Sequence, residues 1–211
     1  MKMRDCKNCR FHSIEDGGIM CNYGIPRFAG VDEAEVCAQY AEPKKQPQSV
    51  SMNADSGEKT WLTPKWIIDV LGAFEIDPCT PDGVMPWRTA DRMVTKSEDG
   101  LRVDWHGKRV WLNPPYGKES VPFFKKMIDD GAHGTALVFA RTDTALWQKY
   151  IFPHANCILF LAGRLRFCKQ DGTQGETATA PSALIAFGEF DGKCLCDAWE
   201  RGYIKGYIMA N

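Results

Sequence analysis

Four consecutive residues near the middle of the chain have the groups needed to bind a planar amine. They are Asn113, Pro114, Pro115 and Tyr116, and they follow a short run, Arg109 to Leu112, that predicts a buried strand. Neither proline has a backbone N–H, so the segment offers hydrogen-bond acceptors without competing donors. The Asn113 side-chain oxygen and the Pro114 carbonyl can each accept one hydrogen of an exocyclic amino group. The Tyr116 ring can stack on the attached heterocycle.

Such a cradle suits methylation of an amine whose lone pair is delocalised into a ring. Accepting both hydrogens draws electron density back onto the nitrogen and aligns it for in-line attack on a methyl sulfonium, so no strong general base is needed. A proline-stiffened turn is the alternative interpretation. The flanking Asn and Tyr favour function, and Asn-Pro-Pro-Tyr resembles the catalytic motif of amino-methyltransferases that use S-adenosylmethionine.

Two segments before the tetrapeptide have the features of a ligand-binding edge. Thr63 and Pro64 open a short amphipathic helix, with Thr63 expected as the N-cap and Pro64 as the first helical residue. A short strand then ends in Asp77 and turns through Pro78, and the carboxyl ends of strands are where α/β sheets bind ligands. Taken alone, an ordinary capped helix and a surface turn would explain both segments.

Only 36 positions separate Asp77 from Asn113, which is short for two full strand–helix units. A reduced sheet is therefore expected between them. Asp99 lies in an Asp-Gly turn within this stretch and could present its carboxylate to an adenosyl group, although a plain turn explains the same pair.

Three arginines are candidates for contacts with phosphate. Arg141 follows a predicted buried strand, and Arg164 and Arg166 alternate, so that both project on one face of an extended segment. An ion pair for Arg141 and a solvated edge for the other two are the alternatives. The Gly/Thr-rich segment from Lys169 to Pro181 is expected to be a mobile loop over the substrate.

Composition limits the class of protein. A chain of 211 residues with 44% hydrophobic positions can bury one core plus a small appendage. Its net charge of −1 excludes a strongly cationic surface throughout, so contacts to DNA must come from local basic patches. The polar N-terminus and the absence of an 18-residue apolar run predict an intracellular chain without a secretory signal or membrane span.

The first 41 residues predict a metal-binding module. Cys6 and Cys9 form a Cys-x-x-Cys pair, and Cys21 and Cys37 can complete a tetrahedral sulfur site for structural zinc. An iron–sulfur cluster fits the same four ligands. His12 could replace one thiolate, although an exposed position in a loop is the simpler interpretation of this histidine. The remaining alternative is that the four cysteines are free thiols and bind no metal. A segment with so few aliphatic side chains needs a bound metal or another cross-link to fold.

The polar, proline-interrupted stretch 42–59 predicts a linker. The expected organisation is thus a cysteine-rich zinc-binding module at 1–41, a linker at 42–59 and a second domain at 60–211.

The motifs of this second domain, taken in order, resemble the phage-type DNA N6-adenine methyltransferase (Dam) family over about Trp61 to Phe187. The resemblance is carried by the Thr-Pro helix, Ile-Asp-Pro-Cys, Asp-Gly-Leu, Trp-Leu-Asn-Pro-Pro-Tyr, Ala-Arg-Thr-Asp-Thr and Gly-Arg-Leu-Arg-Phe. It implies a reduced Rossmann-like α/β methyltransferase core and double-stranded DNA as partner, with a flipped adenine as acceptor. It also implies a phage or prophage protein in a bacterial cytoplasm. S-adenosylmethionine would be held by residues at the motifs above: Thr63, Pro64, Asp77, Pro78, Asp99 and Asn113.

Two other functions fit parts of the pattern. A protein-glutamine methyltransferase would use the same cradle, because its acceptor amide is also planar. A zinc-anchored DNA-binding protein with an inactive methyltransferase core is the other alternative, because the loop after Asp77 has a single glycine, Gly83, where the family has a pair.

Overall fold

The computed structural model describes residues 12–15, 18–21 and 61–210. The chain divides into two compact units, Met1–Ser51 and Met52–Asn211. In the first unit, β1 (His12–Glu15) pairs antiparallel with β2 (Gly18–Cys21), and His12 lies opposite Cys21. His12 therefore lies in a strand and not in a loop. The remaining predicted metal ligands lie outside the described residues: Cys6, Cys9 and Cys37.

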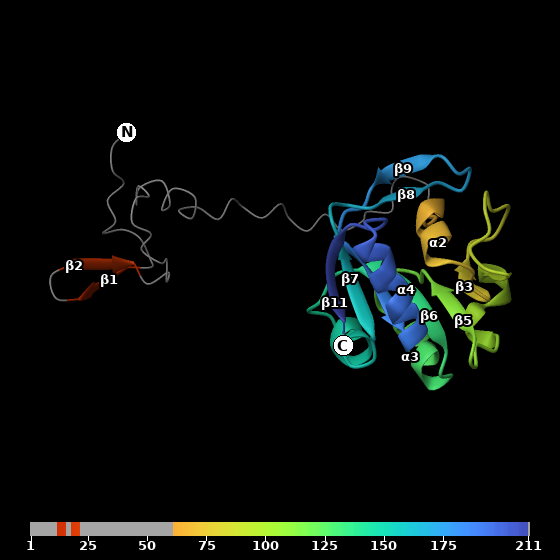
Figure 1. The fold of residues 1–211 in the computed structure, drawn as a ribbon, viewed down its shortest axis with the longest axis horizontal. Helices are drawn as coiled ribbons and strands as arrows, with labels where there is room; N and C mark the ends of the chain where they lie inside the picture. The colour runs from red at the N-terminus through yellow and green to blue at the C-terminus, as the bar shows by residue number, and fades with distance from the viewer. Residues whose placement is uncertain (1–11, 16–17, 22–60, 211) are drawn as a thin grey trace. The chain divides into compact units, whose positions relative to one another are not determined.

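The described part of the second unit is built on a seven-stranded sheet with the order β11-β7-β10-β6-β5-β3-β4 (Figure 1). Strands β4, β3, β5, β6 and β7 run in one direction, and β10 and β11 run in the other. This mostly parallel arrangement confirms the α/β class expected from the sequence. The strand bounds are β3 (Ile76–Thr80), β4 (Arg92–Thr95), β5 (Arg109–Leu112), β6 (His133–Phe139), β7 (Cys157–Leu161), β10 (Ser182–Phe187) and β11 (Gly206–Ala210).

The centre of the parallel region is a topological switch point. From β3 the chain passes to β4 on one side and then returns to β5 on the other side of β3. Loops that leave the carboxyl ends of such strands diverge and open a crevice for a ligand. Only two 3-10 turns, η2 (Lys96–Glu98) and η3 (Gly100–Arg102), separate β4 from β5, so the reduced sheet predicted from the short spacing is confirmed.

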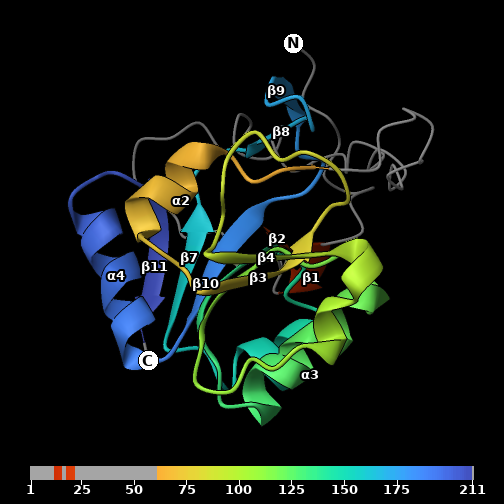
Figure 2. The same ribbon diagram turned by 90° about the vertical axis from the view of Figure 1, so that its right-hand side faces the viewer.

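Helices cover both faces of the sheet. Helices α2 (Lys65–Leu71) and α4 (Glu189–Glu200) pack on one face, and α3 (Val121–Asp129) packs with the π-helical turn η5 (Trp147–Ile151) on the other (Figure 2). Alternate residues of β5 serve the two cores, because Trp111 joins the α2–α4 side whereas Val110 and Leu112 join the α3 side. No helix within the described residues is long and apolar enough to cross a membrane.

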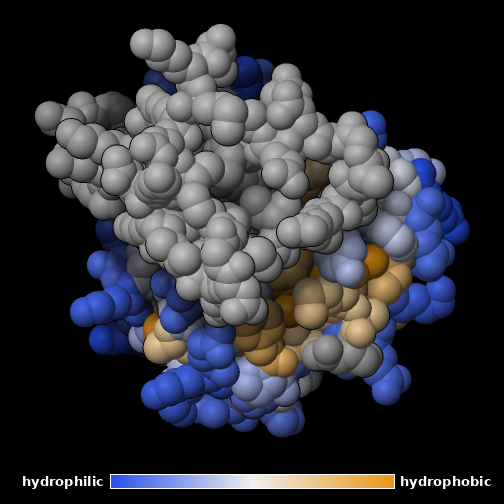
Figure 3. Space-filling view, turned by 90° about the vertical axis from the view of Figure 1, so that its left-hand side faces the viewer, coloured by the Kyte–Doolittle hydropathy of each residue, from blue (hydrophilic) through white to orange (hydrophobic). Residues whose placement is uncertain are grey.

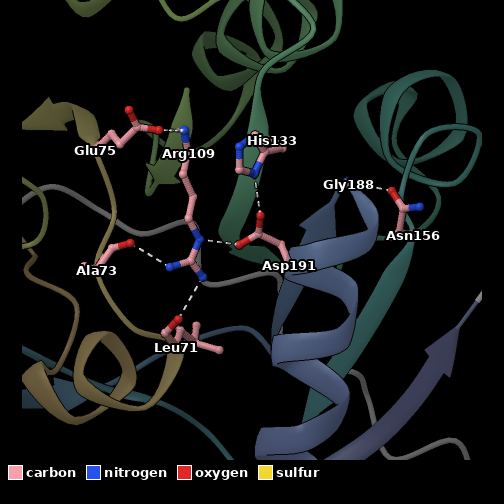
Figure 4. Close-up of polar contacts among 8 residues, drawn as sticks. All are labelled: Leu71, Ala73, Glu75, Arg109, His133, Asn156, Gly188 and Asp191. Carbon is pink, nitrogen blue, oxygen red and sulfur yellow. Dashed lines mark hydrogen bonds and ion pairs between the residues drawn. The ribbon is translucent and has the colours of Figure 1, made fainter. Parts of the chain in front are cut away.

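A buried ion-pair network joins the sheet to α4 and to the end of α2 (Figure 4). Arg109, at the start of β5, donates from Nε to Asp191 of α4 at 2.8 Å, and Asp191 also contacts His133 Nδ1 at 2.8 Å. The other guanidinium nitrogens donate to the carbonyls of Leu71 and Ala73, which end α2. One side chain therefore fixes the helix that leads into β3, at the edge of the sheet opposite the strand ends Leu112 and Phe139.

A two-stranded hairpin follows β7. Its strands are β8 (Arg166–Cys168) and β9 (Gln174–Thr177), and β8 also bridges to Leu62, because the Leu62 and Cys168 backbones exchange hydrogen bonds at 2.8 and 2.9 Å. At the tip, Gln170 Nε2 donates to the Asp82 carbonyl. The prediction of a continuous loop at 169–181 is therefore wrong for residues 174–177, whose polar sequence lacks the apolar alternation that marks a strand.

Strand β11 forms one edge of the sheet and leaves much of its surface exposed. Tyr207 and Met209 point away from the core, with 72% and 44% exposed surface. The view onto this side of the molecule shows apolar residues gathered between hydrophilic ones (Figure 3). Strand β11 is an edge strand whose one neighbour in the described sheet is β7. The backbone N–H and C=O groups on its other side therefore have no partner strand within that sheet.

Candidate active site

The tetrapeptide begins where β5 ends. All four residues of β5 are buried, and Asn113 to Tyr116 follow at its carboxyl end, between the ends of β3 and β6. The strand has the predicted bounds. Because β3, β5 and β6 are parallel, their carboxyl ends meet at one edge of the sheet, and the tetrapeptide lies at the middle of that edge.

The Tyr116 side chain is held by other aromatic rings. It stacks on Phe139 with ring centroids 4.1 Å apart and planes inclined by 11°, and it meets the edge of Phe167 at 6.1 Å. Its hydroxyl donates to Asn113 Oδ1 at 3.4 Å, which is a long contact. Burial raises the pKa of the phenol above its ordinary value, so the hydroxyl stays a donor. The ring and the Asn113 amide thus have fixed orientations before any ligand binds.

Asp77 is buried, with both carboxylate oxygens engaged inside the protein. One oxygen accepts from the Cys79 amide at 2.9 Å, and the other accepts from the Thr89 hydroxyl at 2.5 Å. Burial raises the pKa of Asp77 to about 6, and these hydrogen bonds oppose the rise. Strand β3 continues through Pro78 to Thr80 with a register shift, so the prediction that the strand ends at Asp77 is wrong. The carboxylate thus holds the backbone of β3 between Asp77 and Cys79, where the register shifts.

Asp99 lies in a turn that is packed against β3. It has φ 61°, and within the described residues it alone among non-glycines has a positive φ, so its backbone is strained. Its side chain accepts from Leu101 N at 3.2 Å and pairs with Arg102 Nε at 3.1 Å. The next residue, Gly100, approaches Pro78 so closely that a Cβ there would lie 1.9 Å from the Pro78 carbonyl oxygen. The Asp-Gly turn is therefore packed against β3 at Pro78, next to Asp77.

Thr63 supplies a buried hydroxyl with no hydrogen-bond partner among the described residues. The helix begins at Lys65 with Pro64 as N-cap and without a side-chain capping bond, so the prediction that Thr63 caps the helix is wrong. Buried polar groups are nearly always paired, and those that are not suggest a missing ligand or water. The Thr63 hydroxyl can donate a hydrogen bond, the half-exposed Asp99 carboxylate can accept one, and the Asn113 amide can do both, so each of these groups could bind a polar cofactor with hydroxyl and carboxylate groups.

The three candidate arginines are all exposed but lie in two places. The Arg141 guanidinium lies 5.9 Å from the centre of the Phe139 ring, on which Tyr116 stacks, so Arg141 is close to the tetrapeptide. Arg164 and Arg166 instead line a groove of about 670 Å³ that does not include Asn113. Leu165, which lies between these two exposed arginines in the chain, is buried, so exposed and buried side chains alternate here as the sequence predicts.

Three residues that shape the site were not predicted to do so. Thr89 binds Asp77 from a loop with no motif, and Phe139 orients Tyr116 from a strand that the sequence marks only as apolar. Phe167 ends the Gly-Arg-Leu-Arg-Phe motif, in which only the two arginines were candidates, and its contact with Tyr116 depends on strands far apart in the chain. Within the described residues, no group of three or more His, Cys, Asp or Glu side chains could hold a metal ion.

Comparison with known proteins agrees with this geometry. The family model described as DNA N-6-adenine-methyltransferase (Dam) matches residues 50–197. The chain is 24% identical over 143 residues to the DNA N-6-adenine-methyltransferase of Haemophilus phage HP1 (strain HP1c1), an alignment that covers 63% of this chain and 80% of that protein. No solved structure matches the chain. Because the family match extends over more than half of the chain and includes the tetrapeptide, the chain belongs to the DNA N-6-adenine-methyltransferase (Dam) family.

Proposed function

We propose that this protein methylates the N6 amine of adenine in DNA with S-adenosylmethionine as the donor. The observation that carries the proposal is the place of Asn113 to Tyr116, at the carboxyl end of the strand beside a switch point. There an acceptor pair and a fixed aromatic ring lie next to the loops of β3 and β4. This is the edge at which an α/β sheet brings two ligands together.

The tetrapeptide would bind the flipped base. Asn113 Oδ1 and the Pro114 carbonyl accept the two N6 hydrogens, while the adenine ring stacks on Tyr116. Asn113 Oδ1 can accept from the Tyr116 hydroxyl and from the base at once, because an amide oxygen has two lone pairs. Holding both hydrogens leaves the nitrogen lone pair directed at the methyl group. After the methyl group has left sulfur for nitrogen, the nitrogen carries a positive charge and is strongly acidic, so it loses one proton to water and no buried base is needed.

The cofactor would lie on the loops of β3 and β4. S-adenosylmethionine supplies an electrophilic methyl group that the amine displaces from sulfur. Asp99 would accept from the ribose hydroxyls, Asp77 and Pro78 of β3 would shape the wall beside the adenosyl group, and the unpartnered Thr63 hydroxyl beside Pro64 would meet the methionine end. The strained backbone of Asp99 supports its part, since strain of this kind gathers at ligand sites.

Contacts to the DNA backbone would come from the three exposed arginines. Arg141 is near the target base through its contact with Phe139, whereas Arg164 and Arg166 line a groove that does not include the tetrapeptide. Local patches of this kind are needed, because the net charge of −1 provides no general attraction to phosphate.

The N-terminal part would be a separate module, with a zinc ion on Cys6, Cys9, Cys21 and Cys37 and a linker at 42–59. The four-cysteine spacing supports this proposal, and so does the poverty of residues 1–41 in aliphatic side chains. The metal would be structural, because four thiolates leave no open coordination position for catalysis.

Methyl transfer tests the function directly. The protein is incubated with labelled S-adenosylmethionine and unmethylated DNA, a protein-release factor or neither, and the digested DNA is analysed for N6-methyladenine. Asn113→Ala should lower turnover by roughly two to three decades, comparable to the loss of one preorganised polar group, and cofactor binding should survive. Asn113→Asp keeps an accepting oxygen and should retain far more activity. Normal turnover in Asn113→Ala, or label in the release factor alone, would contradict the proposal.

A further inference from the structure

A groove lies beside the active site. Its volume is about 670 Å³, within the range of sites that hold small molecules, roughly 300–1,000 Å³. The first turn of α2, the β7–β8 connection, β8 and the turn between α4 and β11 form its walls, and part of the β8–β9 hairpin closes one end. Three aromatic and three cationic side chains define it here as the aromatic-basic groove: Trp66, Trp87, Tyr203, Arg164, Arg166 and Lys205.

The charge of the aromatic-basic groove has one sign. Arg164, Arg166 and Lys205 are exposed, and no ion pair is formed by any of them within the described ranges. The fourth lining cation, Lys65, is paired with Asp69. None of the residues that line the groove is acidic. In a chain with nearly equal numbers of acidic and basic residues, three unpaired cations in one groove favour an anionic ligand.

The rings of the aromatic-basic groove are unusually open for large side chains. Trp66 and Tyr203 have 44% and 60% of their surface exposed, and each contributes to the lining. Trp87 lies beside Gly172 of the hairpin, and its indole N–H has no acceptor among the described residues. Exposed rings between cations provide stacking faces next to phosphate sites, which is how proteins bind unpaired nucleic acid.

The groove and the tetrapeptide share strand β8. Phe167 packs its edge against Tyr116, and its neighbours Arg166 and Cys168 line the groove. Successive residues of a strand point to opposite faces, so β8 separates the groove from the ring that would hold the target base. A DNA strand whose target base reaches Tyr116 would thus have its neighbouring nucleotides within reach of the groove.

We propose that the aromatic-basic groove binds unpaired nucleotides next to the target adenine, with phosphates on Arg164, Arg166 and Lys205 and bases stacked on Trp66 and Tyr203. This inference rests on the function proposed above. A double helix buries the faces of its bases, so it would offer phosphates to the arginines but nothing for the rings to stack on. An acidic peptide would satisfy the cations and also leave the rings without a matching partner.

Binding of a labelled single-stranded oligothymidylate to the full-length protein tests the groove by fluorescence anisotropy. This probe contains no adenine, so the target-base pocket contributes no specific contact. Tyr203→Ala should weaken binding by about tenfold, in line with the loss of one stacked base. The matched control is Tyr207→Ala, which removes a tyrosine that is 72% exposed on β11 and outside the groove. It should bind as the wild type does.

Salt dependence separates the two kinds of contact. Arg164→Ala should reduce the slope of log Kd against log salt by about 0.7, the value for one phosphate contact on a single strand. Tyr203→Ala should weaken binding with the slope unchanged. Lys149→Ala, which removes an exposed lysine that does not line the groove, should leave both affinity and slope unchanged.

Three results would overturn the inference. These are equal binding by the groove and control variants, equal loss for a duplex and a single strand in Tyr203→Ala, and tighter binding of an oligoglutamate peptide than of the oligonucleotide. Methyl transfer to DNA is measured separately on the same proteins. If the wild type binds through the groove but makes no N6-methyladenine, the proposed function fails and the groove stands. If it methylates DNA and the groove variants bind normally, the groove fails alone.

Discussion

The orientation of Tyr116 depends on side chains from two other strands. Phe139 of β6 supplies the face on which its ring stacks, and Phe167 of β8 supplies the edge contact. Aromatic pairs of this kind add about 0.5–1.5 kcal/mol beyond the burial of their surface. A ring that is already fixed loses little conformational entropy when a base stacks on it, and this favours the flipped state.

Two substitutions separate the ring of Tyr116 from its hydroxyl. Tyr116→Ala should cost about 1–3 kcal/mol of base binding through lost stacking. Tyr116→Phe removes a single long hydrogen bond to Asn113 and should keep most activity. The measurement is KM and kcat on the same DNA. If both variants were equally damaged, the hydroxyl would be the important group and the stacking role would be wrong.

Asp77 should make stability depend on pH. Its pKa is raised from 3.8 to about 6 by burial, so the folded protein binds this proton more tightly than the unfolded chain does. The contribution of Asp77 to the free energy of unfolding is therefore most favourable below pH 3.8. It decreases as the pH rises towards about 6, by roughly 3 kcal/mol at most.

Asp77→Asn removes this titration and keeps the contacts, because the amide oxygen can accept from Cys79 N and the amide nitrogen can donate to Thr89 Oγ1. Urea unfolding should show that the variant gains stability relative to the wild type as the pH rises through this window. The control is Asp104→Asn, an exposed aspartate with a similar bond to the amide two residues on. An equal pH response in both variants would show that burial of Asp77 is not the cause.

At the level of elements, Arg109 links β5 to α2 and α4 in the buried network. Its guanidinium lies between the rings of Phe74 and Phe190, at 4.3 and 5.0 Å from their centres, and its bonds end on Asp191, Leu71 and Ala73. The Asp191 side chain is fully buried. A buried ion pair stabilises the folded protein little more than apolar side chains of similar size would. Removing one partner of the pair, however, leaves the other as an uncompensated buried charge, which is strongly destabilising.

Arg109→Met should therefore lower the free energy of unfolding by about 3–5 kcal/mol in a urea titration. Adding Asp191→Asn to that variant should recover part of the loss, because the orphaned charge is removed. Lys125→Met, which breaks the exposed pair with Asp129 on α3, should change stability far less, because water screens an exposed pair. If the two single variants were equally stable, the network would not hold the elements together.

The strands that sequence predicts best are those whose apolar residues are bounded by polar or glycine residues. Strand β5 has its predicted bounds, Arg109–Leu112, for this reason, and Asn113 follows it as expected. Residue roles set by distant contacts were not predictable. Arg109 was predicted only as the start of a strand, because its partner Asp191 is 82 positions away.

The candidate site follows the same division. The tetrapeptide and the Asp-Gly turn were found because motif and turn chemistry are local. The helix start was misplaced by one residue, since Thr63 is an acceptable N-cap by type and only the structure shows its hydroxyl without a partner. The groove could not be predicted, because Trp66, Trp87 and Tyr203 are brought together by the fold alone.

At the scale of the whole molecule, the two-unit organisation leads to a prediction about metal. Chelation should unfold the cysteine-rich module, because thiolate binding supplies the folding free energy of a segment with few apolar residues. A fragment that begins near Asn53 should keep most methyl transfer on short DNA. Metal analysis should return about one zinc per chain, and none in Cys6→Ser/Cys9→Ser. If the analysis found iron with acid-labile sulfide, the bound group would be an iron–sulfur cluster and not zinc. If it found no metal, the four cysteines would be free thiols and the prediction of a metal-binding module would be wrong.

The position of β10 between β6 and β7 has a consequence for how the protein is made. Both neighbours precede β10 in the chain, so β6 and β7 have no shared partner until residues 182–187 have left the ribosome. Until then two apolar strands present open edges, the form of nascent chain most exposed to aggregation. Folding of the sheet from its first strand onward is thus excluded for this half. A ribosome stalled before Ser182 would carry a chain in which β6 and β7 lack the strand that joins them.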